Sequence, residues 1–589
     1  MLKEYFLDKV IASVKDLAGK QQLGQLAVQD NFALIAEVPK NTQFGDFAVN
    51  VSSLAKFAKL PPVKIAELIA ENISKENFDI NVTAGFINFK INNIFLNNIL
   101  SEILSKKLDY AKNNQGSGKK VILEYVSANP TGPFHIGHGR WAAMGSALAN
   151  VMKYSGYDVY QEFYINDAGS QIQKLGKSLY IRILQESGIN ISFPDDEEQA
   201  KNFYTGEYLI PAAKEFIKEE PEKAEKIKQD YNGSFNNDYL KYLSKYARLK
   251  MLSRQKELLT NFNTHFDNFF SELTLHESGQ VADCIEKLKE LNVLYEKDGA
   301  LWFASSKYGD DQNRVIKKSD GAYTYLTADI AYHYNKLQRG FDILLNIWGA
   351  DHHGYIPRMK AAIEVLGYNP DSLEVLLGQL VNLVMNGEQV RMGKRTKMIT
   401  LDELIEDVGV DATRYWMIMR SIDTTLDFDI DLAKSKTDEN PVFYVQYAHA
   451  RACSILRHAI EEKYDVINMT TQKSAIQNFE EKIEKLKAED YNIIWECGDE
   501  KSIETTKKLL LKLEEYKSVV QQAAKNRTPY LLTKYLQELA ACFHQFYAFS
   551  KVLVDDEKLM LARLSIVKAV ILILKSALQL IAVDAPERM

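Results

Sequence analysis

The sequence predicts a multidomain protein built around a parallel α/β sheet, with an α+β module before it and an all-α domain after it. The 589 residues correspond to about four domain-sized units. A strand, turn, helix, strand pattern begins near residue 121, as in a parallel βαβ unit. From about residue 436 onward helical periods dominate and strand patterns are hard to find.

Composition excludes several classes of protein. Hydrophobic residues make up 46% of the chain and charged residues 26%, close to the globular average. Disordered, collagen-like and coiled-coil chains are therefore excluded. The net charge of −7 argues against a generally basic, non-specific nucleic-acid binder, although a local basic face remains compatible with it.

The cysteines and the apolar segments indicate a cytoplasmic protein. The four cysteines have neither metal-ligand nor redox-motif spacing, so we expect reduced thiols and no structural zinc: Cys284, Cys453, Cys497 and Cys542. The first residues mix charges into a helical period, unlike a signal peptide. The most apolar late stretch, 569–574, is far too short to span a bilayer, so we expect no membrane contact.

The sequence patterns predict helices and strands for each part of the chain in turn. Residues 1–110 open with a helical pattern, continue with a proline-initiated helix at 61–73, and include a strand-like run at 84–91. A linker-like segment follows at 111–120. The central pattern then comprises strands at 121–127 and 157–165 around a helix at 139–156, and apolar runs at 341–350 and 372–387 around a helix at 358–367. A Lys- and Glu-rich helical insertion is expected at about 195–260.

The turn after the first central strand reads SANPTGPFHIGHGR, residues 127–140. His135 and His138 share one helix face, and a helix that begins there offers N–H groups and a positive dipole end to an anion. Gly137 lets a flat base or a phosphate approach the backbone. Such a site suits a nucleoside triphosphate attacked at its α-phosphate. The alternative is a pair of solvent-exposed histidines that cap a helix, although only about 0.008 chance occurrences of His-x-Gly-His are expected.

Several segments resemble class I aminoacyl-tRNA synthetases, and arginyl-tRNA synthetases in particular. HIGH at a first βα turn is the class I signature, and ANPTGPFHIGHGR between EYVS and FYINDAGSQI resembles the arginyl members. Further similar segments are DGAYTYLTADIAYH (320–333), WGADHHGY (348–355), LDFDIDLAKSKTDENPVFYVQYAHAR (426–451) and the final APERM. The resemblance extends over nearly the whole chain.

The resemblance implies a domain order and a reaction. It implies an N-terminal added domain that contacts the tRNA elbow (1–110), a Rossmann-like class I catalytic domain (119–390), a signature-loop and stem-contact region (391–435), and a helical anticodon-binding domain (436–589). The implied reaction ligates L-arginine to tRNA(Arg) through an arginyl-adenylate, with ATP and its Mg²⁺ as substrate and AMP and pyrophosphate as products. We expect a monomer.

An arginine pocket requires carboxylates, because a planar, permanently charged guanidinium is best recognised by paired carboxylate oxygens. The resemblance places Glu124 and Asn129 around the substrate's α-amino end and includes Ser127 in the same pocket. It places Tyr325 and Asp329 around the guanidinium. The alternative for Asp329 is an N-cap of the helix that follows.

Two further segments are candidates for ATP binding. Gly349, Asp351 and His352 follow an apolar strand, at the end that lines the crevice of a doubly wound sheet, and the resemblance assigns them to the ATP ribose. The alternative there is an ordinary turn.

The segment VRMGKRTKM, 390–398, resembles the second class I signature, KMSKS. Arg391 stands at the first lysine, Gly393 replaces the serine, and Lys394 keeps the second lysine. Arg391 and Lys394 are expected to clamp the β- and γ-phosphates, whereas the alternative is a solvated basic loop. Thr400 and Glu403 then predict a capping box.

In the C-terminal part, Tyr444, Tyr447 and Arg451 fall on one helical face. Aromatic side chains beside a guanidinium suit unstacked bases, but a tyrosine stripe is also typical of a core edge. The expectation that this face binds tRNA comes from the resemblance.

Two other functions remain open. A class I synthetase for another amino acid is less favoured, because a purely aliphatic pocket needs neither Glu124 nor Asp329. A tRNA-binding regulator that has lost catalysis is also less favoured, because both histidines, Lys394 and Asp329 are present.

Overall fold

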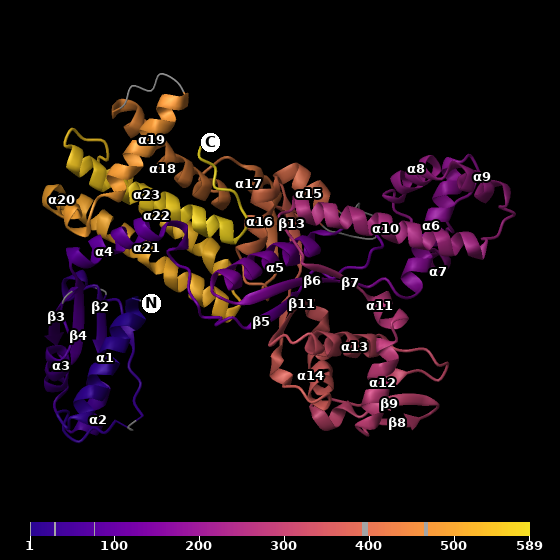
Figure 1. Cartoon of the computed structure of the whole chain (residues 1–589), viewed down its shortest axis with the longest axis horizontal. Coiled ribbons are helices and arrows are strands. Elements are labelled where there is room, and N and C mark those ends of the chain that lie inside the picture. The colour runs from indigo at the N-terminus through magenta and orange to yellow at the C-terminus, as the bar shows by residue number, and fades with distance from the viewer. Residues whose placement is uncertain (1, 29–30, 40, 76, 391–398, 464–468) are drawn as a thin grey trace.

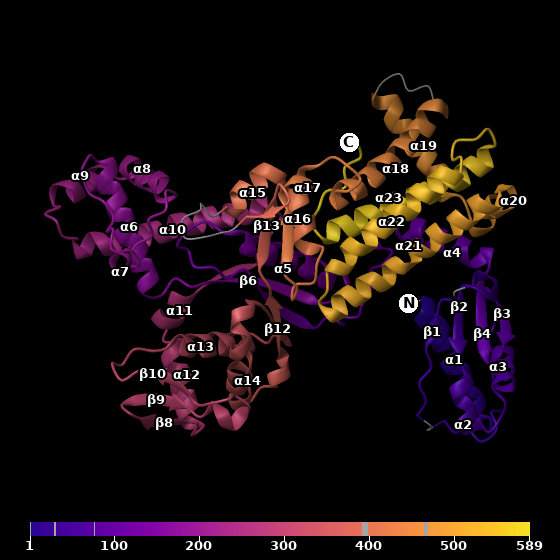
Figure 2. The same ribbon diagram turned by 180° about the vertical axis from the view of Figure 1, so that it is seen from behind.

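The structure is a computed structural model that describes residues 2–28, 31–39, 41–75, 77–390, 399–463 and 469–589. The parallel sheet lies in the middle of the molecule (Figure 1). The N-terminal module and the C-terminal helices lie toward one end of the long axis, and the helices α6–α10 lie at the other end. The view from behind shows the same order of parts (Figure 2).

The N-terminal module is a four-stranded antiparallel sheet covered by helices, in the order β1-β2-β4-β3. Phe6 packs against the rings of Phe47, Phe78 and Phe89 in its core. The proline-initiated helix is present, with Pro62 at its first position. The elements are α1 (Leu2–Gly19), β1 (Ala36–Glu37), β2 (Phe47–Asn50), α2 (Ala55–Ala58), α3 (Pro62–Glu71), β3 (Phe78–Thr83), β4 (Phe86–Ile91) and α4 (Asn93–Lys106).

The central sheet is five-stranded and entirely parallel, in the order β12-β11-β5-β6-β7. The chain winds from β5 toward β7 on one side and then returns to place β11 against the other side of β5. The strand order therefore reverses at β5, and the crevice at the carboxyl ends there is where such sheets bind ligands. The strands are β5 (Lys120–Glu124), β6 (Asp158–Ile165), β7 (Asn268–Ser271), β11 (Ile343–Gly349) and β12 (Leu373–Gly378), and α5 (Ile136–Tyr154) connects β5 to β6.

A helical insertion between β6 and β7 has its own core. This unit includes α6, which the expected range of 195–260 did not contain, because Leu175 and Leu179 of α6 pack against Phe216 and Met251. Its helices are α6 (Ser170–Glu186), α7 (Glu197–Ala200), α8 (Leu209–Glu219), α9 (Pro221–Gln229) and α10 (Asn237–Asn261).

A second unit between β7 and β11 carries a small antiparallel sheet, β10-β9-β8, that the sequence patterns did not reveal. Its inner face, with Phe303 and Ile316, packs under α12 and α13. The elements are α11 (Glu272–Glu277), α12 (Gln280–Glu290), β8 (Leu294–Lys297), β9 (Ala300–Phe303), β10 (Arg314–Lys317) and α13 (Tyr325–Gln338), and α14 (Ile356–Val365) follows β11.

The rest of the chain joins the central sheet to a helical domain. A third sheet, β14-β13-β15, and three short helices form the junction: β13 (Val381–Met385), β14 (Glu388–Gln389), α15 (Leu401–Val408), α16 (Val410–Ile418), β15 (Leu426–Asp429) and α17 (Ile430–Lys434). The helical domain contains α18 (Pro441–Lys463), α19 (Met469–Glu484), α20 (Asn492–Cys497), α21 (Glu500–Asn526), α22 (Tyr530–Phe549) and α23 (Glu557–Leu580). The predicted multidomain architecture with its parallel sheet is confirmed.

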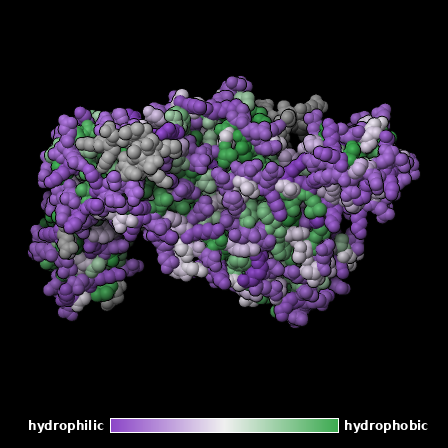
Figure 3. Space-filling view, turned by 45° about the horizontal axis from the view of Figure 1, so that its top comes forward, coloured by the Kyte–Doolittle hydropathy of each residue, from purple (hydrophilic) through white to green (hydrophobic). Residues whose placement is uncertain are grey.

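The distribution of polar and apolar residues on the surface agrees with the globular composition of the chain. The face shown in Figure 3 is mostly hydrophilic, and its hydrophobic side chains lie in separate patches. Among the described residues, no helix is both long enough and apolar enough to cross a bilayer.

Candidate active site

Two cavities open at the carboxyl ends of the central strands. The first, of about 590 Å³, is the carboxylate cavity, and it is lined by residues that include Glu124, Ser127, Asn129, Tyr164, Glu272, Tyr325, Asp329, Gly349, Asp351, His352 and Tyr355. The second, of about 1170 Å³, is the histidine cavity, and its lining includes His135 and His138. Ser127 and Asn129 line both, so the two cavities adjoin at the turn after β5.

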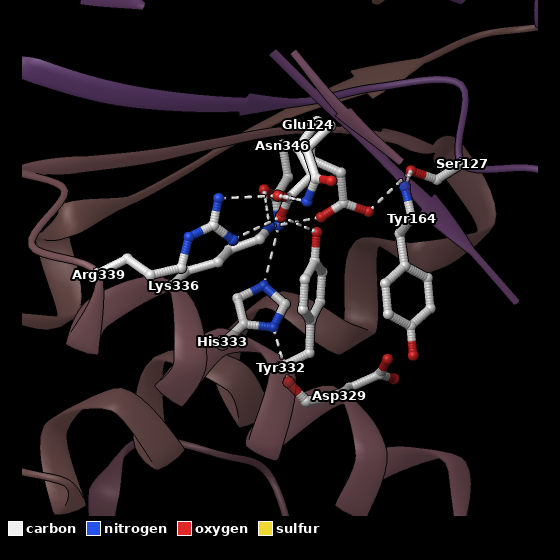
Figure 4. A network of polar contacts seen from close by, with 11 residues as sticks. Glu124, Ser127, Tyr164, Asp329, Tyr332, His333, Lys336, Arg339 and Asn346 are labelled. Carbon is white, nitrogen blue, oxygen red and sulfur yellow. Dashed lines mark hydrogen bonds and ion pairs between the residues drawn. The ribbon is translucent and has the colours of Figure 1, made fainter. Parts of the chain in front are cut away.

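Glu124 ends β5 at one end of the carboxylate cavity and is buried. Its Oε2 accepts a hydrogen bond of 2.5 Å from Nζ of Lys336, a fully buried lysine on α13. Lys336 also donates to Oδ1 of Asn346 on β11 at 3.1 Å. Figure 4 shows these side chains converging between the helix and the sheet. Glu124 is therefore a fixed carboxylate whose charge is balanced from within the protein.

Ser127 holds Glu124 in place. Its hydroxyl donates to Oε1 of Glu124 at 2.9 Å and accepts the Tyr164 backbone N–H at 3.2 Å. Val126 and Ser127 both have positive φ, 69° and 35°, which is strained for side chains of these types. The hydrogen bonds of Ser127 stabilise this strained turn, so its hydroxyl is occupied by protein groups.

Asp329 lies at the other end of the carboxylate cavity. The N-cap alternative for Asp329 is wrong, because Thr324 is the N-cap of α13 and Asp329 lies one turn further on. Its Oδ2 accepts a hydrogen bond of 2.5 Å from the Tyr355 hydroxyl. Burial raises the pKa of Asp329 to about 6.

Glu272 is a functional candidate that sequence reasoning missed. It is the first residue of α11, directly after β7, and is only 5% exposed. Burial, and next the Asp329 carboxylate, raise the pKa of Glu272 to about 7. Neither carboxylate forms an ion pair with Lys or Arg within the described part of the chain. Two carboxylates that resist ionisation in one cavity are suited to a cationic ligand.

A polar chain connects the two ends of the carboxylate cavity. His333 donates from Nδ1 to the Asp329 carbonyl oxygen at 2.8 Å, and its Nε2 accepts from the Asn346 amide at 2.9 Å. Burial lowers the pKa of His333 to about 3, so the ring is neutral. Since Asn346 also binds Lys336, the backbone beside Asp329 is linked to the partner of Glu124 (Figure 4).

The remaining predicted residues of this cavity lie at its mouth. Tyr325, the first residue of α13, is 68% exposed. Gly349, Asp351 and His352 follow β11, and the Asp351 and His352 side chains are exposed. A Cβ at Gly349 would lie 2.5 Å from Oδ1 of Asp351, so a side chain there would displace the exposed Asp351 carboxylate.

The two histidines of the signature stack on each other at the start of α5, with ring centroids 3.7 Å apart. The Nδ1 atom of His135 accepts the Gly137 N–H at 3.1 Å, and Nδ1 of His138 accepts the His135 N–H at 3.2 Å. Burial lowers the pKa of both, to about 3 for His138, so both rings are neutral and carry their proton on Nε2. Both histidines thus cap the helix, but they are partly buried and not solvent-exposed as the alternative supposed, and each Nε2–H remains a donor.

The chain returns to this turn after the second signature. The predicted capping box at the start of α15 is confirmed, with Thr400 and Glu403 as its members. Thr400 bridges to His135, and the Leu401 N–H donates to the Phe134 carbonyl at 2.9 Å. The predicted phosphate-binding residues Arg391 and Lys394 lie outside the described residues.

The predicted tRNA-binding residues lie on α18. Tyr447 is 38% exposed and stacks on Phe443 at 6.0 Å between centroids. The Arg451 guanidinium lies 4.6 Å from the Tyr547 ring centroid, and Tyr444 lies 5.1 Å from the His544 ring. The face is thus an open aromatic surface around Tyr447 and a packed one around Tyr444.

Comparison with known proteins matches nearly the whole chain. The catalytic-domain profile of class I tRNA synthetases (R) matches residues 99–419, the arginyl-tRNA synthetase N-terminal domain profile matches 7–91, and the DALR anticodon-binding domain profile matches 445–589. An arginine–tRNA ligase of Geobacillus kaustophilus is 42% identical over 98% of this chain and 100% of its own. The chain belongs to the arginyl-tRNA synthetase family.

Other comparisons agree with membership of this family. An arginine–tRNA ligase of Anoxybacillus flavithermus is 44% identical over 95% of this chain and 94% of its own. The arginyl-tRNA synthetase of Thermus thermophilus has the same fold, with a TM-score of 0.70 at 20% identity over all of both chains. The carboxylate and histidine cavities lie inside the segment matched by the synthetase catalytic domain.

Proposed function

We propose that this chain ligates L-arginine to tRNA(Arg) in two steps, through an arginyl-adenylate, with ATP consumed and AMP and pyrophosphate released. The observation that carries the proposal is the pairing of Asp329 with Glu272 in a cavity that adjoins the His135–His138 pair. A site for a guanidinium thus lies beside a site for a triphosphate.

Arginine lies along the carboxylate cavity. Its guanidinium lies between Asp329 and Glu272, under the exposed ring of Tyr325, where planar donors meet carboxylate oxygens. Its α-amino group faces Glu124 and Asn129 at the opposite end. Ser127 acts on the substrate through Glu124, because its hydroxyl is already bonded to that carboxylate.

In the first step the arginine carboxylate oxygen attacks the α-phosphate. A carboxylate–phosphorus bond forms, the bond from that phosphorus to the bridging oxygen breaks, and pyrophosphate leaves with the electron pair. The Nε2–H groups of His135 and His138 donate to phosphate oxygens as charge develops. Gly137 allows close approach to the backbone, and the protein forms no covalent bond.

ATP enters as its Mg²⁺ complex, with the metal held mainly by phosphate oxygens, and no zinc is required. Gly349, Asp351 and His352 bind the ribose. Arg391 and Lys394 hold the β- and γ-phosphates, and the position of Thr400 beside His135 supports this, because the chain returns to the histidine cavity soon after Lys394.

The transfer step requires tRNA. The N-terminal module contacts the tRNA elbow, and Tyr444, Tyr447 and Arg451 contact unstacked bases of the anticodon arm. The enzyme acts as a monomer in the cytoplasm.

The test is to charge total tRNA with each of the twenty amino acids in turn. Arginine alone should give an acid-precipitable product, and ATP–pyrophosphate exchange with arginine should be measurable when tRNA is present. Charging by another amino acid would assign the carboxylate cavity to a different substrate, and no charging at all would favour a non-catalytic tRNA-binding protein.

A further inference from the structure

The helical insertion donates hydrogen bonds to the turn at residues 129–132, which leads into the first signature. Gln255 of α10 donates from Nε2 to the carbonyl oxygens of Asn129, at 3.2 Å, and Gly132, at 2.9 Å. The Tyr208 hydroxyl, just before α8, donates to the Thr131 carbonyl oxygen at 2.6 Å. Two side chains of the insertion thus bind three carbonyl groups of a single four-residue turn.

This turn depends on external donors. Pro130 and Pro133 have no N–H, so the segment has fewer backbone donors with which to satisfy its carbonyls. The contact is also close, because a Cβ added at Gly132 would lie 3.3 Å from the Tyr208 ring. The side chains of Tyr208 and Gln255 therefore fix the path of the chain from β5 to α5.

Tyr208 and Gln255 are connected to each other through Arg254. Arg254, the neighbour of Gln255, donates to the Tyr208 carbonyl oxygen at 3.3 Å and to Glu215 at 2.8 Å. Gln255 is only 3% exposed. Because α8 and α10 share one hydrophobic core, a displacement of the insertion would move both donors together.

The turn at residues 129–132 joins the two cavities. Asn129 lines both of them, and His135 follows three residues after Gly132. A shift of this turn would change the distance between bound arginine and the phosphate-binding imidazoles. Misplacement of reacting groups by about 1 Å can reduce a rate by about 100-fold.

We propose that Tyr208 and Gln255 are positioning residues for adenylate formation, and that the helical insertion fixes the geometry of the first chemical step through them. The inference rests on the proposed function. It gives the insertion a role in aligning arginine and ATP that does not depend on contact with RNA.

The test uses the full-length enzyme with Tyr208→Phe and Gln255→Met, two nearly isosteric changes that remove the tyrosine hydroxyl and the glutamine amide. ATP–pyrophosphate exchange with arginine and tRNA should show kcat lowered by about 10- to 100-fold, with a much smaller change in the KM for arginine. The melting temperature should stay close to that of the unmodified protein. Tyr242→Phe is the matched control, since it removes a tyrosine hydroxyl of α10 that binds the half-buried Glu220, away from the turn.

A double-mutant cycle sharpens the test. Because both residues hold one turn, the doubly substituted enzyme should lose less activity than the product of the two single effects. The inference is overturned if both variants keep the kcat of the unmodified enzyme, or if kcat falls only in proportion to thermal stability. Failure of the unmodified enzyme to activate arginine would instead contradict the proposed function.

Discussion

At one end of the carboxylate cavity Glu124 is paired with the buried Lys336, whereas at the other end Asp329 and Glu272 form no ion pair with lysine or arginine among the described residues, and Glu272 lies 3.7 Å from the His276 ring. At the paired end Lys336 fixes the Glu124 carboxylate, which faces the α-amino group of arginine in the proposed binding mode. The unpaired end holds carboxylates whose pKa values are raised to about 6 and about 7. A buried charge that the protein balances fixes geometry, and one that it leaves unbalanced indicates where a charged ligand binds.

The largest expected effect comes from breaking the paired end. Lys336→Met should destabilise the protein by about 3–5 kcal/mol, because the buried Glu124 carboxylate loses its cation. Urea-induced unfolding followed by near-ultraviolet circular dichroism measures this loss. The double substitution Glu124→Gln with Lys336→Met should recover most of it, since both charges are then removed.

Lys360→Met is the matched control for this change. Lys360 lies on α14 and pairs with the exposed Asp371, so its loss should cost less than about 1 kcal/mol. Equal effects of the two lysine substitutions would contradict the view that Glu124 depends on an internal cation.

A substitution at the unpaired end should weaken arginine binding instead of destabilising the protein. Asp329→Asn keeps the shape of the side chain and removes the charge that faces the guanidinium. We expect the KM for arginine to rise by about 30- to 1000-fold, corresponding to about 2–4 kcal/mol, with the KM for ATP nearly unchanged. Steady-state charging kinetics test this, with Asp371→Asn as the control. A proportional rise in both KM values would place Asp329 outside the guanidinium site.

Sequence reasoning found one member of each end but missed both partners. Glu124 and Asp329 lie in segments with recognisable patterns. Lys336 is separated from Glu124 by 212 residues, and lysine is rarely buried, so the local pattern of α13 suggests an exposed side chain. Glu272 follows a strand of only four residues, NFFS, and its place in the cavity depends on the pairing of β7 with β6.

The turn that carries the first signature likewise has a position that the sequence predicts and tertiary contacts that it does not. Its position between a strand and a helix followed from the Pro and Gly residues and from the spacing of the histidines. That Gln255 and Tyr208 hold this turn could not be predicted, because the packing of the insertion against it is a long-range tertiary contact. The antiparallel sheet β8–β10 was missed for a related reason: its strands are four residues long and alternate poorly.

The pH dependence of arginine binding separates the two ends further. A protonated Glu272 or Asp329 cannot form an ion pair, so affinity for arginine should rise by about tenfold between pH 6 and pH 8 and level off above both pKa values. In the free protein a carboxyl whose folded pKa is raised makes folding less favourable as pH rises from its unfolded pKa of about 4 to its folded pKa of about 6 for Asp329 or about 7 for Glu272. Bound arginine reverses this effect, so it should raise the melting temperature more at pH 8 than at pH 6.

Glu272→Gln tests the origin of this pH dependence. The variant should lose most of the change between pH 7 and pH 8 and keep the part near pH 6 that belongs to Asp329. A pH profile identical to that of the unmodified enzyme would show that Glu272 does not face the guanidinium.

The smallest expected effect concerns the turn that holds the paired end. Ser127→Ala removes the hydroxyl that binds both Glu124 and the Tyr164 N–H, and each hydrogen bond is worth about 1 kcal/mol. The KM for arginine should rise by about fivefold, with kcat little changed, as Glu124 gains freedom. Ser127→Gly removes the same hydroxyl but relieves the positive φ, so it should be more stable than Ser127→Ala. If the two variants share the raised KM and differ in stability, the hydroxyl acts on arginine through Glu124; if the KM follows stability, strain in the backbone is the controlling factor.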